Sequence, residues 1–168
     1  MMARITFKGN PIHTSGELPA SGGALPAFAL TKGDLGELQS SELAGKTVIL
    51  NIFPSLDTSV CAKSVRQFNQ DAGALPNSIV LCISHDLPFA MNRFCTAEGL
   101  KNVQVLSCFR HADFGTKFGV TIMEGPLKGL LARAVVVVNS QGKVVHSELV
   151  PEIAQEPDYS AALAAARR

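Results

Sequence analysis

Two apolar runs, each followed by a segment with helical periodicity, restrict the fold of this chain more than any other feature. The runs are KTVILNIF (46–53) and NSIVLCIS (77–84), and apolar side chains fill consecutive positions in both. Strands of this composition lie in a sheet that is covered on both faces. Strands that alternate with helices form βαβ units, so we expect an α/β fold with a largely parallel centre.

Hairpins are expected on both sides of this unit. RITFKGNPIHT (4–14) alternates around a Gly-Asn pair, and residues 130–150 form two apolar runs joined by a polar turn. The second hairpin adds an antiparallel pair, which makes the sheet mixed. Gly, Pro and Ser are frequent in 15–45, which predicts mostly loop with short pieces of regular structure. No linker divides the single domain expected over 1–168. Helices are expected at 60–75, 87–99, 112–119 and 157–168, and a further strand at 102–107.

Length and charge exclude several classes of protein. The chain has 168 residues, of which 46% are hydrophobic, and this suits one packed domain. A net charge of +1, without a dense Lys/Arg stripe, argues against nucleic acid and anionic membrane as partners. MMARITFKGN has no apolar signal region, and no stretch approaches the ~18 residues of a membrane span. We therefore expect a cytoplasmic protein.

The four cysteines, Cys61, Cys82, Cys95 and Cys108, form no CxxC pair. Structural zinc sites usually draw their ligands from such tight pairs, so no metal site is expected. Cytosolic disulfides are usually catalytic or redox-sensing, which argues against a permanent framework. Cys82 lies in the middle of an expected strand and suits packing, whereas Cys108 suits a structural or surface thiol.

The segment PSLDTSVC (54–61) places a cysteine where a strand leads into a helix. With Thr58 as the N-cap, Cys61 falls at the third helical position. Unpaired backbone N–H groups and the helix dipole favour a thiolate there. Helix N-termini are among the places where a cysteine pKa falls from about 8.5 to ~3.5–7.5. The position therefore suits a reactive cysteine better than an inert one.

Ionisation alone does not make an efficient catalyst, because a thiolate of low pKa is a weaker nucleophile. Preorganised donors have to stabilise charge in the transition state. The Thr58 hydroxyl can point at the sulfur or its reaction partner, and Pro54 can shield the sulfur from water. Arg133 lies in the apolar run GLLARAVVVVN, where an unpaired charge would be costly. It is our candidate cation beside Cys61, and a structural ion pair is the alternative.

Three motifs in order resemble one known family. PSLDTSVC fits the P-x-x-x-T/S-x-x-C signature of the peroxiredoxins. NIFPSLDTSVC, NRFCTAEGL and GPLKGLLARAVVVV together resemble the bacterial thiol peroxidase subfamily of atypical 2-Cys peroxiredoxins. The likeness extends from FKGNPI to EPDYSAAL, nearly the whole chain. It implies a thioredoxin-like fold with an N-terminal β-hairpin and a central mixed sheet flanked by helices.

The resemblance also implies a reaction cycle. Cys61 would be the peroxidatic cysteine, which attacks a peroxide and becomes a sulfenic acid. Cys95 would resolve it as an intramolecular disulfide, which thioredoxin reduces by exchange. Pro54, Thr58 and Arg133 match the family's active-site positions. Hydrogen peroxide and alkyl hydroperoxides are the implied substrates, antioxidant defence the implied role and a homodimer the implied assembly, without any cofactor.

Cys61 and Cys95 fall on different expected helices, whereas a disulfide needs Cα atoms within about 7 Å. We therefore expect part of these helices to unwind before the bond forms, and core packing is the alternative role of Cys95. Apolar residues could line a groove for alkyl chains, with core packing again the alternative. The candidate groove residues are Phe53, Ile122, Met123 and Leu127.

Two other functions stay open at this point. One is a thioredoxin-like oxidoreductase that exchanges disulfides with proteins, against which the missing CxxC argues. The other is a redox sensor or binding module that uses the same sulfenic acid as a signal without catalytic turnover.

Overall fold

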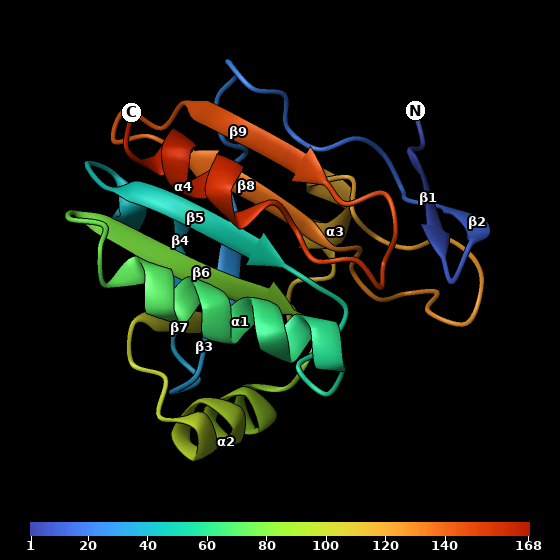
Figure 1. Cartoon of the computed structure of the whole chain (residues 1–168), viewed down its shortest axis with the longest axis horizontal. Helices are drawn as coiled ribbons and strands as arrows, with labels where there is room; N and C mark the ends of the chain where they lie inside the picture. The colour runs from blue at the N-terminus through green and yellow to red at the C-terminus, as the bar shows by residue number, and fades with distance from the viewer.

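A seven-stranded sheet forms the centre of the computed structural model, which describes residues 1–168 (Figure 1). Its strand order is β4-β3-β7-β6-β5-β8-β9, so neighbours in space are often distant in sequence. The strands are β3 (Ala29–Lys32), β4 (Glu37–Gln39), β5 (Thr47–Ile52), β6 (Ser78–Ser84), β7 (Val103–Ser107), β8 (Ala134–Val138) and β9 (Val144–Leu149).

The sheet is mixed, as expected, but its parallel part is smaller than the sequence suggested. Only β5–β6 and β6–β7 are parallel, joined by α1 (Ser59–Ala72) and α2 (Pro88–Glu98), and the other four of the six pairings are antiparallel. One reason is the direction of β8. Its first residue, Ala134, lies opposite Ile52, the last residue of β5, so β8 runs antiparallel to β5.

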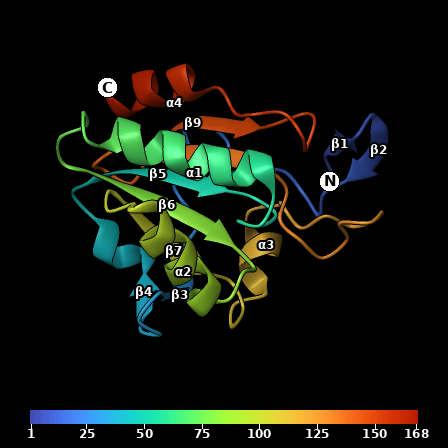
Figure 2. The same cartoon turned by 60° about the horizontal axis from the view of Figure 1, so that its bottom comes forward.

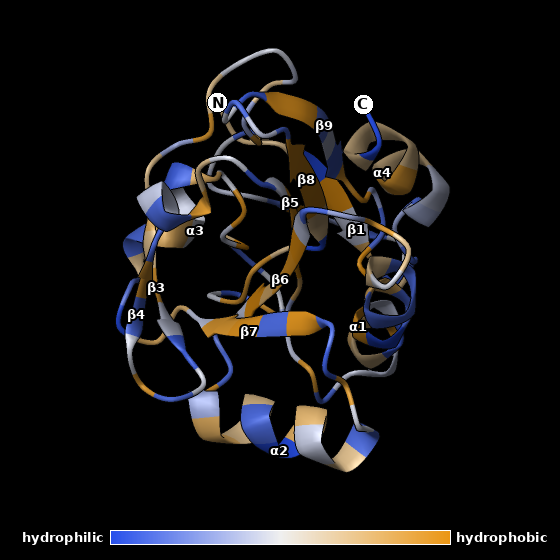
Figure 3. Ribbon diagram, turned by 90° about the vertical axis from the view of Figure 1, so that its left-hand side faces the viewer, coloured by the Kyte–Doolittle hydropathy of each residue, from blue (hydrophilic) through white to orange (hydrophobic).

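Apolar residues on both faces of the central strands separate the molecule into two cores. On one face α1 packs over β6 and β7, α2 over β7, and α4 (Tyr159–Ala166) over β5, β8 and β9 (Figures 1 and 2). On the other face lie the 3₁₀ helix η1 (Ser40–Leu43) and α3 (Asp113–Lys117). In β5, Ile49 belongs to the first core and Val48 and Leu50 to the second. Figure 3 shows these central strands as hydrophobic, which confirms a sheet covered on both faces.

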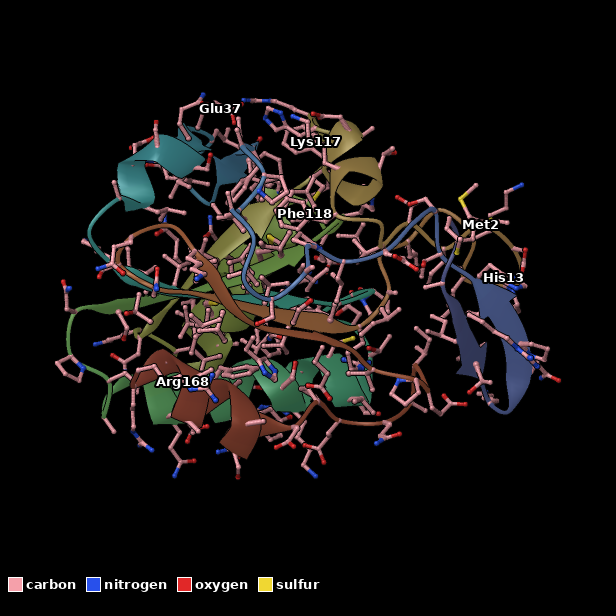
Figure 4. All side chains as sticks on the ribbon, turned by 90° about the horizontal axis from the view of Figure 1, so that it is seen from above. Met2, His13, Glu37, Lys117, Phe118 and Arg168 are labelled. Carbon is pink, nitrogen blue, oxygen red and sulfur yellow. The ribbon has the colours of Figure 1, made fainter.

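A separate hairpin, β1 (Arg4–Phe7) and β2 (Asn10–His13), projects at one end of the molecule, where Figure 4 labels His13. Lys8 and Gly9 form its turn with φ of 51° and 81°, the positive values that a two-residue hairpin turn needs. Its Thr6 N–H donates to the Pro151 carbonyl at 2.8 Å. The Glu152 carboxylate accepts from the Thr6 hydroxyl at 3.0 Å and from the Gly9 N–H at 2.9 Å, which holds the turn against this segment.

Most expected boundaries agree with the structure within two or three residues. Asp158 caps α4 through a bond from the Ala161 N–H, and Gly99 ends α2 with φ of 66°. The late hairpin differs, because residues 130–133 precede β8 instead of belonging to it. None of the helices combines the length and apolar character needed to cross a membrane.

Candidate active site

Cys61 occupies the first turn of α1, three residues after Thr58, which is the N-cap as expected. The side chain is fully buried, beside Val65 and Phe68 of the same helix. The preceding loop leaves the C-terminal end of β5, so the helix N-terminus and the sulfur lie at the edge of the sheet where β5 and β6 end.

Arg133 reaches this sulfur from the start of β8. Its guanidinium Nη2 lies 3.3 Å from Cys61 Sγ, and its Nε donates to the Ile153 carbonyl at 2.9 Å. The side chain is 1% exposed, and its Nη1 has no hydrogen-bond partner. The positively charged guanidinium is in direct contact with the sulfur. Leaving a buried donor unpaired costs ~1–3 kcal/mol. The Nη1 group is such a donor, because no acceptor in the protein pairs with it.

Glu156 provides negative charge near this buried cation without touching it. The carboxylate accepts from the Tyr159 hydroxyl at 2.9 Å and pairs with Lys63 at 3.1 Å. The hydrogen bonds from Lys63 and then Tyr159 lower the pKa of the Glu156 carboxyl, and Arg133 adds a smaller attraction from a longer distance. Arg133 therefore has no direct ion pair, contrary to the alternative of a structural pair.

Thr58 and Pro54, the two residues expected beside the sulfur, differ in their burial. Pro54 is buried, in agreement with a shielding role, whereas Thr58 is exposed. The Thr58 hydroxyl donates to the Ser55 carbonyl at 2.9 Å, and it neither caps α1 nor points its hydrogen at the sulfur. This local bond is a common alternative for threonine at a helix start. The oxygen keeps its lone pairs free to accept a hydrogen bond.

A cavity of about 240 Å³ opens beside these residues. Pro54, Thr58 and Arg133 line it together with Leu127, the only member of the expected groove that does so. Its other walls are Phe7, Lys8, Ser59, Val60, Leu130, Ile153 and Ala154.

The other three expected groove residues lie elsewhere. Phe53 is fully buried in the core under α1, and Ile122 is buried in the opposite core. Met123 is 41% exposed but does not line the cavity. Phe53 continues the line of β5, with its N–H donating to the Ile83 carbonyl at 3.1 Å, and its side chain packs in the core under α1. The Met123 N–H donates to the His13 carbonyl at 2.9 Å. Core packing, the alternative reading, applies to Phe53 and Ile122.

The family model for redoxins matches residues 20–163. The chain belongs to the redoxin family. This redoxin is 60% identical over 164 residues to the thiol peroxidase of Mycobacterium tuberculosis (strain ATCC 25618 / H37Rv), with 98% of each chain covered. It is 55% identical over 164 residues to the thiol peroxidase of Corynebacterium glutamicum, with 98% of this chain and 99% of the relative covered.

Similar solved structures support the assignment to this family. A peroxiredoxin-like protein from Aquifex aeolicus superposes with a TM-score of 0.92 at 37% identity, covering 99% of this chain and 97% of that chain. A thiol peroxidase from Chromobacterium violaceum shares the fold with a TM-score of 0.87 at 22% identity, covering 94% and 91%. The resemblance to peroxiredoxin thiol peroxidases and the thioredoxin-like α/β fold are thus confirmed. The single domain over 1–168 stays a prediction.

The remaining cysteines of this redoxin differ in environment. Burial raises the pKa of the Cys82 thiol to about 12 and that of the Cys108 thiol to about 12. Cys95 is half-buried on α2, and burial raises its pKa as well. All four thiols are free, with Cys61 and Cys95 on separate helices. Cys82 and Cys108 are therefore placed as packing residues, whereas Cys95 has surface access.

Sequence reasoning missed Asp86, whose carboxylate binds the loop before α1. It accepts from the Ser55 hydroxyl at 2.7 Å and from the Leu56 N–H at 2.8 Å. The available signal was its position two residues after the strand 78–84, because neighbouring parallel strands end at the same edge. Phe7 and Lys8 gave no such local signal.

Proposed function

We propose that this chain reduces hydroperoxides by thiol chemistry at Cys61. Thiol peroxidase is the name shared by the relatives at 60% and 55% identity. The observation that carries the assignment is Arg133, a residue that lines the cavity, with Nη2 at 3.3 Å from the sulfur and Nη1 buried without a partner. One guanidinium can therefore hold the thiolate and present a donor to an incoming oxygen.

The chemistry follows from these positions. The Cys61 thiolate attacks the hydroxyl oxygen of the hydroperoxide, the O–O bond breaks, and the sulfur becomes a sulfenic acid. The electron pair of the broken bond leaves on the other oxygen, which takes up a proton to give water or an alcohol. The Arg133 donor stabilises charge on the peroxide oxygens in the transition state. The Thr58 oxygen accepts from the peroxide hydroxyl, and Pro54 excludes water.

Resolution requires Cys95. Its thiol condenses with the sulfenic acid, releases water and leaves a disulfide, and a thioredoxin-type dithiol reduces that bond by exchange. Because the Cα atoms have to approach within about 7 Å, the first turn of α1 and part of α2 rearrange. Support comes from the half-exposed position of Cys95, which lines a surface depression with Asn92. The proposal also includes thioredoxin as the reductant and alkyl hydroperoxides as substrates. It further includes a homodimer as the assembly and the cytoplasm as the location.

The test is rapid mixing of the reduced protein with hydrogen peroxide and cumene hydroperoxide, followed by mass mapping. Cys61→Ser should abolish peroxide reduction. Cys95→Ser should complete one oxidation but lose thioredoxin-driven turnover, and equal turnover by that variant would overturn the two-cysteine cycle. Steady peroxide consumption with thioredoxin and its reductase excludes a sensor without turnover as the main role. An insulin-reduction assay tests the disulfide-exchange alternative.

A further inference from the structure

Asp86 holds the loop of the peroxidatic cysteine although it belongs to a different strand connection. It follows the end of β6, next to the end of β5 from which this loop departs. Oδ1 accepts from Ser55 Oγ at 2.7 Å, and Oδ2 accepts from the Leu56 N–H at 2.8 Å. One carboxylate therefore binds two successive residues of the loop.

Ser55 transmits this hold to the start of α1. Its carbonyl accepts from the Thr58 N–H at 3.2 Å and from the Thr58 hydroxyl at 2.9 Å. Its hydroxyl oxygen accepts from the Asp57 N–H at 3.2 Å. No side chain caps the N-terminus of α1, so these loop bonds determine where the helix begins. Cys61 lies three residues after that point.

Asp86 is itself fixed to the sheet. The Ser84 hydroxyl donates to its Oδ2 at 2.6 Å, and the Ser107 hydroxyl at the end of β7 donates to its carbonyl. Asp86 also lies two residues before α2, the helix that carries Cys95. The carboxylate thus joins a rigid sheet edge, the peroxidatic loop and the segment leading to the resolving helix.

We propose that Asp86 is a positioning residue that holds the first turn of α1 in the geometry for peroxide attack and opposes the unwinding that a Cys61–Cys95 disulfide requires. The proposal rests on the proposed function, because it divides that cycle into two steps with opposite needs. A folded first turn favours formation of the sulfenic acid, and an unwound turn favours its condensation with the Cys95 thiol. Loss of Asp86 should therefore slow the first step and accelerate the second.

The test is Asp86→Asn, with both steps followed by rapid quenching and mass spectrometry. One amide oxygen cannot accept from Ser55, Leu56 and Ser84 together, and hydrogen bonds to charged groups are the stronger ones. We expect the second-order rate constant for sulfenic acid formation to fall about tenfold and the rate constant for disulfide formation to rise about tenfold. A second hydrogen peroxide can oxidise the sulfenic acid to a sulfinic acid and is itself reduced to water. The yield of this sulfinic acid should fall.

Asp113→Asn is the matched control, since this exposed carboxylate pairs with Lys117 on α3, away from the loop, and should leave both rates unchanged. Ser55→Ala removes the bond to Asp86 and the bond from the Asp57 N–H but keeps the bond from the Leu56 N–H to Asp86, so it should move both rates in the same directions by less. This variant decides the matter if Asp86→Asn does not fold. A decrease of both rates, or no change in either, would overturn the proposal. If the wild-type protein forms no sulfenic acid at Cys61, the proposed function itself fails.

Discussion

Arg133 is a buried charge whose cost in stability is explained by its role in the proposed reaction. The guanidinium is buried, with one nitrogen on the sulfur, one on a carbonyl and one unpartnered. Replacement of a buried charge by a packed apolar side chain is often neutral or stabilising. The energetic justification for this arginine therefore lies in the reaction.

Arg133→Met should separate the effect of this side chain on the reaction rate from its effect on stability. We expect the rate constant for peroxide reduction to fall about 10²–10³-fold, as when a transition-state donor is removed. The melting temperature should stay the same or rise, because the unpaired donor is gone. Stopped-flow kinetics and calorimetry measure the two quantities. A variant that melts well below the wild type yet keeps its specific activity would show a structural role instead.

Buried thiols predict a loss of stability at high pH. The pKa of Cys82 is raised from the usual value near 9 to about 12 by burial, so the unfolded chain releases this proton at lower pH than the folded one. Stability from this group is complete below pH 9 and falls as the pH rises from 9 towards 12. Urea unfolding at several pH values should show the decline, and Cys82→Ala should make it less steep, because the pKa of the Cys108 thiol is raised to about 12 as well. An equally steep decline in the variant would assign it to other groups, such as Tyr159.

The two helices that carry Cys61 and Cys95 are bonded directly to each other. Arg66 of α1 donates two hydrogen bonds to Glu98 of α2, at 3.0 and 2.7 Å, and lies 5.7 Å from the Phe94 ring. Phe94 and Glu98 flank Cys95 on α2. The hydrogen bond from Arg66 lowers the pKa of the Glu98 carboxyl, so the pair persists at neutral pH and weakens only under acidic conditions.

Glu98→Gln should therefore release α2 without disturbing the site of attack. We expect disulfide formation to become a few-fold faster, while the rate of sulfenic acid formation stays unchanged. Raised salt should mimic the change in the wild type, because exposed pairs are screened. Rapid quenching separates the steps. A slower peroxide step in Glu98→Gln would mean that the tie also supports α1.

The cavity is a property of the whole molecule, because three distant parts of the chain close it against the start of α1 and the loop before that helix. The hairpin contributes Phe7, the loop before β8 contributes Leu127 and Leu130, and the segment after β9 contributes Ile153. Glu152 holds the hairpin turn in this position. If substrate binds in this cavity, as proposed, we expect its size to be controlled by residues that are separated by most of the chain.

Phe7→Ala should lower the rate constant for cumene hydroperoxide about three- to tenfold and leave that for hydrogen peroxide unchanged. The reason is that only the larger substrate needs the apolar wall. Met123→Ala is the control, since Met123 lies outside the cavity lining, and competitive kinetics compare the two substrates. An equal decrease for both substrates in Phe7→Ala would indicate damage to the site itself.

Much of this protein could be predicted because it depends on short-range interactions. The N-terminal hairpin, the ends of α2 and α4, and the place of Cys61 in the first turn of a helix all follow from neighbouring residues. The hairpin turn lies at Lys8-Gly9, one residue before the Gly9-Asn10 pair at which the sequence pattern predicted it. The burial of strands 46–53 and 77–84 likewise follows from their apolar composition. The family motif added the pairing of Cys61 with Cys95, which remains a proposal.

The order of the sheet decided the rest. The entry of β8 beside β5 brings Arg133 against Cys61 across 72 residues, and the edge shared by β5 and β6 brings Asp86 to Ser55. The same packing buries Phe53 away from the cavity and brings Phe7 into it. Local sequence limits the conformation of a few neighbouring residues, whereas such contacts depend on how distant elements pack. Only the tertiary structure could therefore complete the site.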